Sequence, residues 1–507
     1  MALSGLRNTA GPLQAKVGPA NAQLMRRGRR PVVAVFQAAL QMTMVMLLAA
    51  GAVRPAAAGV GDDVRAFVAD PLGAAAMAQA SAETEDACPR IGLAEGVLTL
   101  HDAVARMLCL NPRVRLARAG VMAEVAALGQ ARSAYLPRLS ATFRRLDDVT
   151  AIDAADRSTS NRTRGESSAL SLTWRLLDPG GRDANIDAAA DLLAAALSSR
   201  DATVLQVTGA GIQAYFDVQA AHAALEAHRA NREVAHATLA SVERKQGAGA
   251  AAEADRLQAI TAQARAELEV SRAQGALAQA RAVLATWTSL PPQLPFMLPA
   301  LAAPESPQVP ALDPVLSHAR LLHPAVAAAR LKESAARAQV DAARAEGRPT
   351  LDLVAAEYRN GRPDQSLSTA PSRERQMAVV LTVPLFEGFE RSYRIRAAQA
   401  VVEQREAQAQ EESQKMLAEI VQAHAALAAA GDTLRASGVL FESAGASHAS
   451  ALRRFRAGAA DLREVLNTQQ TLDDARLQRV RSVTEWHAAS LRLAAAAGNL
   501  GPELLRN

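Results

Sequence analysis

The sequence repeats its own landmarks, and this repetition constrains the fold more than any other feature. Asn111-Pro112 and His323-Pro324 lie 212 residues apart. Gly249-Ala250-Ala251 and Gly458-Ala459-Ala460 follow in the same order and lie 209 residues apart. An internal duplication of this length predicts two structurally equivalent units, each with a helix, a pair of strands, a very long helix, a turn and another helix.

A helical stripe of apolar and small residues occupies the middle of each repeat. Its members recur at alternating steps of three and four, which is the spacing of a coiled-coil-like seam, and the small ones permit close approach of a partner helix. They are Val204, Val207, Gly211, Ala214, Val218, Ala221 and Leu225 in the first repeat, and Ser413, Met416, Ile420, Ala423, Leu427, Ala430 and Leu434 in the second. We expect long helices over 182–246 and 390–456, each spanning roughly 100 Å.

Each repeat also carries two strand-like segments. The strands are expected at Arg138–Val149 and Ser167–Leu177, joined by a polar stretch at Asp153–Gly165, and at Thr350–Tyr358 and Gln376–Phe386, joined by Arg359–Arg375. Leu170, Leu172 and Trp174 alternate with polar residues, as in a sheet with one apolar face. The lengths suit a tilted bilayer crossing, but four strands cannot close a barrel, so several chains would have to contribute. Two hairpins packed on helices are the alternative.

Composition favours long helices over a compact enzyme core. Aromatic residues are only 3% of the chain, whereas enzyme-like cores bury more large side chains. The net charge is +5, but the arginines are dispersed among acidic residues, so we predict no nucleic-acid partner. The run at 247–252 is similar to a dinucleotide-binding fingerprint but follows a charged helix instead of a strand. We therefore predict no enzymatic activity, no cofactor and no metal.

The N-terminal region predicts export. Basic residues at Arg26–Arg30 precede an apolar run at Val32–Val53. The small residues Ala56-Ala57-Ala58 follow this run. This order is that of a secretory signal peptide cleaved after Ala58, with Met25 as an alternative start. A transmembrane anchor is the alternative interpretation of the apolar run.

A proline-rich linker separates the two repeats and completes the predicted organisation. The predicted segments are a signal peptide at 1–58, an N-terminal extension at 59–96, a first repeat at 97–289, the linker at 290–311, a second repeat at 312–500 and a tail at 501–507. Cys88 in the extension and Cys109 in the first repeat would lie in an oxidising compartment after export. They would either pair as a disulfide or remain incidental thiols.

Taken together, the duplication, the proline breaks, the strand pairs and the glycine turns resemble the TolC-like outer-membrane factors over about 98–501. Arg456-Ala457-Gly458 followed by Glu464-Val465 is similar to the family's tip signature of Arg-x-Gly, five residues, an acidic residue and Val. Gly249 and Asp255 show the same spacing in the first repeat, with Gly247 in place of the arginine. The resemblance implies a mainly α protomer with membrane β-strands, a homotrimer with a twelve-stranded barrel, and a long periplasmic tunnel.

The resemblance also implies partners at the periplasmic end of that tunnel. The tip turns would meet a periplasmic membrane-fusion adaptor through Gly249, Arg456, Gly458 and Val465. An inner-membrane ABC exporter or another pump would supply the energy, and outer-membrane lipid would surround the strands.

A gated aperture is the functional site that the resemblance implies. Glu464, Asn467 and Asp255 are the residues expected to surround it, and a ring of carboxylates would favour cations. The alternative for Glu464 is an exposed helix residue paired with Arg463. Some positions depart from the family: Asn467 replaces an aspartate, Phe455 a tyrosine and Ala460 an arginine, so the family's gating contacts are not all available here.

The predicted function is export through a channel in the outer membrane. The resemblance favours type I protein secretion, with small-molecule efflux as the alternative. A periplasmic coiled-coil scaffold is the alternative from another class. Such a scaffold has no need for two hairpins at matched positions, so the strands favour the channel.

Overall fold

A computed structural model of the chain describes residues 96–499, with gaps at 155–156, 250, 292, 300, 302–303, 305–307, 362–370 and 458. The predicted signal peptide, the extension up to residue 95 with Cys88, the turn residue Gly458 and the tail lie outside the described residues.

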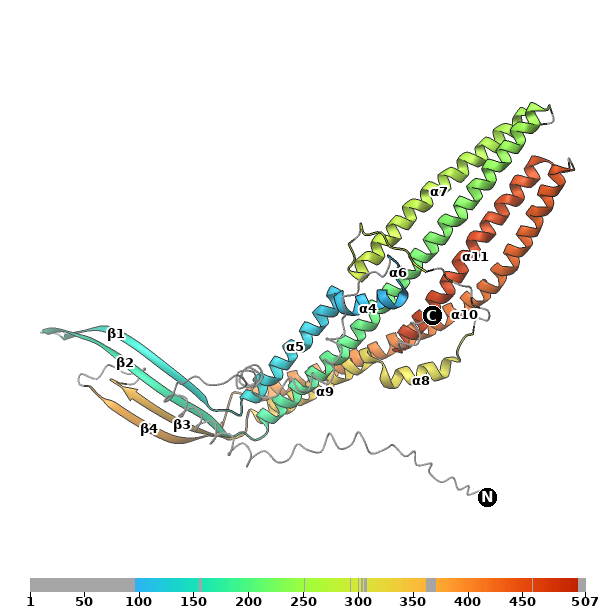
Figure 1. Ribbon diagram of the computed structural model, residues 1–507. Helices are drawn as coiled ribbons and strands as arrows, with labels where there is room; N and C mark the ends of the chain where they lie inside the picture. Colours follow the sequence, from blue (N-terminus) through green and yellow to red (C-terminus); the bar gives the residue numbers. More distant parts are fainter. Residues whose placement is uncertain are drawn as a thin grey trace, which may run out of the picture. The chain divides into compact units, whose positions relative to one another are not determined.

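The same series of elements occurs twice (Figure 1). The first series is α4 (Leu100–Leu110), α5 (Pro112–Ser133), β1 (Arg138–Ala154), β2 (Arg157–Leu177), α6 (Gly181–Gly247) and α7 (Glu253–Thr288). The second is α8 (Leu312–Leu322), α9 (Pro324–Ala345), β3 (Thr350–Arg359), β4 (Arg373–Thr382), α10 (Glu390–Arg456) and α11 (Leu462–Ala496). Helices of 11, 22, 67 and 36 residues are matched by helices of 11, 22, 67 and 35 residues, as the duplication predicts.

The paired proline landmarks mark the boundary between the first two helices of each repeat. Asn111 ends α4 and caps α5, because its Oδ1 accepts a hydrogen bond from the Arg113 amide at 2.9 Å. Pro112 then takes the first helical position, where a missing N–H costs nothing. His323 and Pro324 have the same backbone arrangement between α8 and α9.

The predicted seams are mostly buried. In α10 the seam from Met416 to Ala430 packs with α8, α9 and α11. In α6 the seam lies in a larger cluster formed with α4, α7 and the linker. Gly211 belongs to this seam, and a Cβ there would lie 2.1 Å from the Sδ of Met107 in α4. Glycine at this position therefore leaves room for the Met107 thioether between α4 and α6.

The described residues of the linker form hydrogen bonds with the helical region. Leu98 donates to the Met297 carbonyl at 2.8 Å, and the Gln219 side chain of α6 donates to the Pro299 carbonyl at 2.7 Å. At its far end, His424 of α10 lies 2.9 Å from the Pro310 carbonyl oxygen. These contacts give backbone groups of the extended, proline-rich linker hydrogen-bond partners outside the linker.

The strands form one antiparallel sheet in the order β1-β2-β3-β4. Pairing of β2 with β3, for example Ser171 opposite Ala356, joins the two repeats. Among the described residues, no helix has both the length and the hydropathy needed to cross a membrane.

Four predicted strand boundaries are wrong. The stretch 153–165 was expected to be a polar connection, yet most of its described residues continue β1 and β2, with Ile152 opposite Thr159. Ladder hydrogen bonds need only the backbone, so serine, threonine and arginine extend the hairpin without an apolar face. In the second repeat β4 begins three residues early, at Arg373, and ends at Thr382 instead of Phe386. Pro384 follows and has no N–H for the ladder.

The two faces of the sheet differ in polarity. One face carries exposed apolar side chains, which we call the apolar belt: Leu139, Phe143, Leu170, Met377, Val379 and Leu381, with exposed fractions from 49% to 83%. The other face carries small and polar residues, among them Ser140 and Ser171 with their hydroxyls 2.8 Å apart. An ion pair at 2.9 Å joins Arg175 to Asp352 on this polar face.

Candidate functional site

Two helical tips are formed where α6 turns into α7 and where α10 turns into α11 (Figure 1). Gly249 has φ +72°, and no heavy atom lies within 4 Å of the position its Cβ would take. Its amide donates to the Gln246 carbonyl at 2.8 Å and closes the end of α6. The left-handed backbone explains a glycine here. Gly458, the matching residue, lies outside the described residues.

An acidic side chain caps the second helix of each tip. Asp255 accepts a hydrogen bond from the Ala252 amide at 3.2 Å at the start of α7. Asp461 accepts from the Glu464 amide at 2.8 Å at the start of α11. Negative charge is favourable at a helix N-terminus, so both carboxylates hold the turn that precedes them. Asp255, predicted at the aperture, thus has a structural contact in its own hairpin.

Glu464 pairs across its own hairpin with Arg454, whose Nη1 lies 2.7 Å from Oε1. The sequence suggested Arg463 as the partner, but the turn brings Arg454 of α10 opposite the first turn of α11. The two side chains are 36% and 55% exposed, and such surface pairs contribute only about 0–1 kcal/mol. The pair therefore leaves the Glu464 carboxylate accessible to ions.

A stripe of exposed and half-exposed polar residues continues along α11 from Glu464. Asn467, Thr471 and Asp474 follow it at steps of three, four and three residues, which keeps them on one face of the helix. Sequence reasoning identified Glu464 and Asn467 but missed Asp474. The same helical spacing could have found it, about 15 Å further along the axis.

The other predicted tip residues are divided between the surface and the interior. Arg456 is exposed at the end of α10. Val465 is fully buried, in a cluster that also contains Val242, Ala259, Phe455 and Leu462. This cluster joins the two tips because its members come from α6, α7, α10 and α11. Sequence reasoning predicted an adaptor contact for Val465, and that contact stays a prediction.

The ammonium group of Lys245 also links the tips. The Nζ of Lys245 in α6 lies 3.6 Å from the ring centroid of Phe455 in α10, and it donates to the Phe455 carbonyl at 3.0 Å. Further along, the Gln469 amide of α11 donates to Asn231 of α6 at 2.8 Å. Sequence reasoning missed both contacts, and Phe455 was noted only as the loss of a tyrosine hydroxyl.

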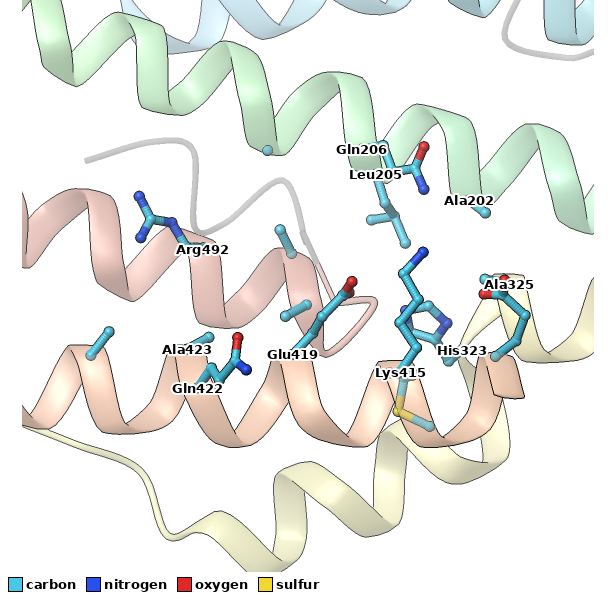
Figure 2. Close-up of a pocket in the computed structure, with 16 residues that line it drawn as sticks. Ala202, Leu205, Gln206, His323, Ala325, Lys415, Glu419, Gln422, Ala423 and Arg492 are labelled. Carbon is cyan, nitrogen blue, oxygen red and sulfur yellow. The ribbon is translucent and has the colours of Figure 1, made fainter. Parts of the chain in front are cut away.

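A groove of about 460 Å³ lies far from the tips, between α6, α9, α10 and α11 (Figure 2). Lys415 and Glu419 project from α10 toward α6, near His323. The buried Nδ1 of His323 has no hydrogen-bond partner, and burial lowers the pKa of this imidazole.

In the described part of the chain, no cluster of three or more His, Cys, Asp or Glu side chains could hold a metal ion. Cys109 is half-buried in α4, and its pairing with Cys88 stays a prediction.

Comparison with known proteins shows that the chain is similar to outer membrane channel proteins. The family model for outer membrane efflux proteins matches residues 103–288 and 315–499. Protein CyaE of Bordetella pertussis is 32% identical over 408 residues, which cover 80% of this chain and 85% of that protein. The CmeC outer membrane channel of Campylobacter jejuni has a similar fold, with a TM-score of 0.69 at 20% identity over 79% of this chain and 85% of that one. The outer membrane protein VceC of Vibrio cholerae gives 0.66 at 20% identity, over 79% and 96% of the two chains.

Proposed function

Because the chain belongs to the outer membrane efflux protein family and is located in the outer membrane, we propose that it forms the homotrimeric channel-tunnel of a type I secretion system. Three chains place their strands in one closed sheet and their helices in one tunnel. A periplasmic adaptor contacts the helical tips, and an inner-membrane ABC exporter drives transport. The exposed apolar belt is the observation that carries the channel, because a scaffold in water gains nothing from exposing these side chains.

The edges of the sheet support closure by neighbouring chains. Within one chain, β1 and β4 each pair on one side only. Open strand edges are not tolerated in lipid, so each outer edge needs a strand from another copy. An antiparallel pairing of β4 with β1 of the next chain repeats the internal β2–β3 pairing.

Helix packing supports the same closure. In the second repeat, α9 packs against both α10 and α6. Its equivalent α5 packs on α6 but not extensively on α10. Leu116 of α5 is 75% exposed and Tyr393 of α10 is 67% exposed. In the trimer, α10 of the neighbouring chain would occupy the place beside α5 and cover both surfaces.

Protein cargo is the finer part of the proposal. The arginine-rich, alanine-heavy sequence resembles the outer-membrane component of the adenylate cyclase toxin exporter, and the likeness to CyaE extends over most of both chains. In a strain that lacks this gene, we expect loss of one or a few secreted proteins with unchanged susceptibility to antimicrobial compounds. Increased susceptibility with unchanged secretion would instead favour small-molecule efflux.

Channel formation and the aperture are tested together in planar bilayers. The detergent-purified protein should give discrete, cation-preferring channels. Glu464→Gln should lower the preference for cations, and Arg454→Gln should raise it, because the two substitutions change the charge of one ring in opposite directions. Glu269→Gln is the matched control, since its carboxylate on α7 is also 36% exposed and 2.7 Å from an arginine.

The outcomes separate the parts of the proposal. Folded protein that never conducts would contradict the channel. Channels that respond equally to Glu464→Gln and Glu269→Gln would retain the channel but remove Glu464 from the aperture.

A further inference from the structure

The apolar belt ends in a row of charged residues on the same face of the sheet. Residues two apart on a strand share a face, so Arg145 follows Phe143 on β1 and Arg375 precedes Met377 on β4. Directly paired residues also share a face. Six arginines lie in this row, which we call the arginine band: Arg145, Arg162, Arg164, Arg359, Arg373 and Arg375.

The band carries excess positive charge. Among the residues whose side chains the structure describes, three carboxylates share its face, and each contacts one or more of the arginines. Asp147 accepts from Arg162 at 2.6 Å and Arg164 at 3.0 Å. Glu357 contacts Arg373, Arg375 and Arg359 at 2.7, 3.2 and 3.4 Å, and Glu166 lies 4.0 Å from Arg145.

The three carboxylates leave most of the donors of the band available. The arginine side chains are 52% to 87% exposed. Each guanidinium has five N–H donors, so the carboxylates occupy only part of them.

The position of the band indicates which surface it meets. The helices join the sheet at Arg138 and Leu177, and the band lies toward the opposite, hairpin end of the strands. If the proposed function is correct, the apolar belt faces lipid, the helices are periplasmic and the band reaches the outward leaflet. A ligand that contacts both surfaces has apolar chains next to an anionic headgroup.

We propose that the arginine band binds the phosphates of a glycolipid in the outer leaflet while the apolar belt contacts its acyl chains. Guanidinium groups match phosphate because their planar fork donates two parallel hydrogen bonds. Exposed arginines are individually weak sites, but several next to one anionic surface act together.

The test uses the full-length protein in detergent and three probes: diphosphoryl lipid A, its fully dephosphorylated form and phosphatidylglycerol. Retention is measured by native mass spectrometry. The variant is Arg145→Gln/Arg164→Gln/Arg375→Gln, which leaves Asp147 paired with Arg162 and Glu357 paired with Arg373. The control, Arg229→Gln/Arg272→Gln/Arg435→Gln, removes three exposed helical arginines with the same change in charge.

Wild type and control should retain the diphosphoryl probe at least roughly tenfold better than the band variant. Wild type should also prefer it over both other probes. The proposal would be overturned if wild type retained the dephosphorylated probe as well as the diphosphoryl probe. It would also be overturned if the control lost as much retention of the diphosphoryl probe as the band variant. Equal retention of phosphatidylglycerol would replace the glycolipid with any anionic lipid and so overturn the assignment.

Bilayer conductance of the same variant distinguishes this inference from the proposed function. If the protein forms conducting channels but does not prefer the diphosphoryl lipid, only the proposed lipid binding by the arginine band is contradicted. Phosphate-dependent retention by a protein that never conducts contradicts the channel.

Discussion

Lys245 and Phe455, 210 residues apart, place an ammonium group over an aromatic ring where the two helical tips meet. A cation over a ring contributes about 0.5–2 kcal/mol. We therefore predict that Lys245→Met loosens the tips and speeds amide hydrogen exchange over 239–252 and 452–466 about twofold to thirtyfold. Lys332→Met, an exposed lysine on α9, is the control. Unchanged exchange in Lys245→Met would show that the contacts of Lys245 do not hold the tips together.

Two helical glycines should respond in opposite ways to alanine. Gly211→Ala places a Cβ against the Met107 sulfur, so the seam must shift, at a cost of about 1–3 kcal/mol. Gly275→Ala meets no atom within 4 Å and should stabilise α7 by about 0.5–1 kcal/mol, because alanine loses less backbone entropy. Urea unfolding followed by circular dichroism measures both. A Gly211→Ala protein as stable as wild type would mean that the Met107 side chain or α4 can move aside at no cost.

Neighbouring valines on β4 test which face of the sheet meets lipid. Val379 belongs to the apolar belt, and Val380 lies on the polar face. Val379→Lys should weaken folding into vesicles by about 2–4 kcal/mol, as for a cation at the bilayer midplane, whereas Val380→Lys should have a smaller effect. The reverse order of the two variants would place the apolar belt away from lipid.

Asp473 on α11 should make stability depend on pH. Burial raises the pKa of its carboxyl to about 7; Arg476 opposes the shift and Asp474 adds to it. Between about pH 4 and 7 the folded state then holds a proton that the unfolded state has lost, so this group lowers stability as pH rises. Asp473→Asn should therefore stabilise the protein at pH 8, by at least about 1 kcal/mol after allowance for partial exposure, and have little effect at pH 4.

The control for this prediction is Asp432→Asn, which changes an exposed carboxylate on α10. Thermal unfolding of each variant is compared with wild type at both pH values. A benefit of Asp473→Asn that is equal at pH 4 and pH 8 would show that removal of the proton equilibrium is not its cause.

Periodicity predicted the helical part of the fold well. The stripes through Val207 and Met416 specify one buried face at helical spacing, and the proline landmarks mark the starts of α5 and α9. The long helices were expected at 182–246 and 390–456 and lie at Gly181–Gly247 and Glu390–Arg456. The extension of β1 and β2 could not be predicted from alternation, since Ser158 and Thr159 pair through backbone groups that any residue supplies.

The tips show why the site was harder to predict. The resemblance to the family's tip signature singled out Glu464 and Gly249. The partners of these residues depend on how the hairpins meet, and no local pattern indicates that Arg454 lies opposite Glu464 or that Lys245 covers Phe455. Spacing along one helix does carry information, and for that reason Asp474 could have been found.

Pairing of β2 with β3 has a consequence for how the chain acquires its structure. Ser168 lies opposite Arg359, so this ladder cannot form until nearly two hundred further residues have followed β2. Until then the first hairpin has an unpaired edge beside an apolar surface, which is the combination that promotes aggregation. Assembly of the sheet is thus a late event, and the nascent first hairpin is exposed to aggregation until β3 has been made.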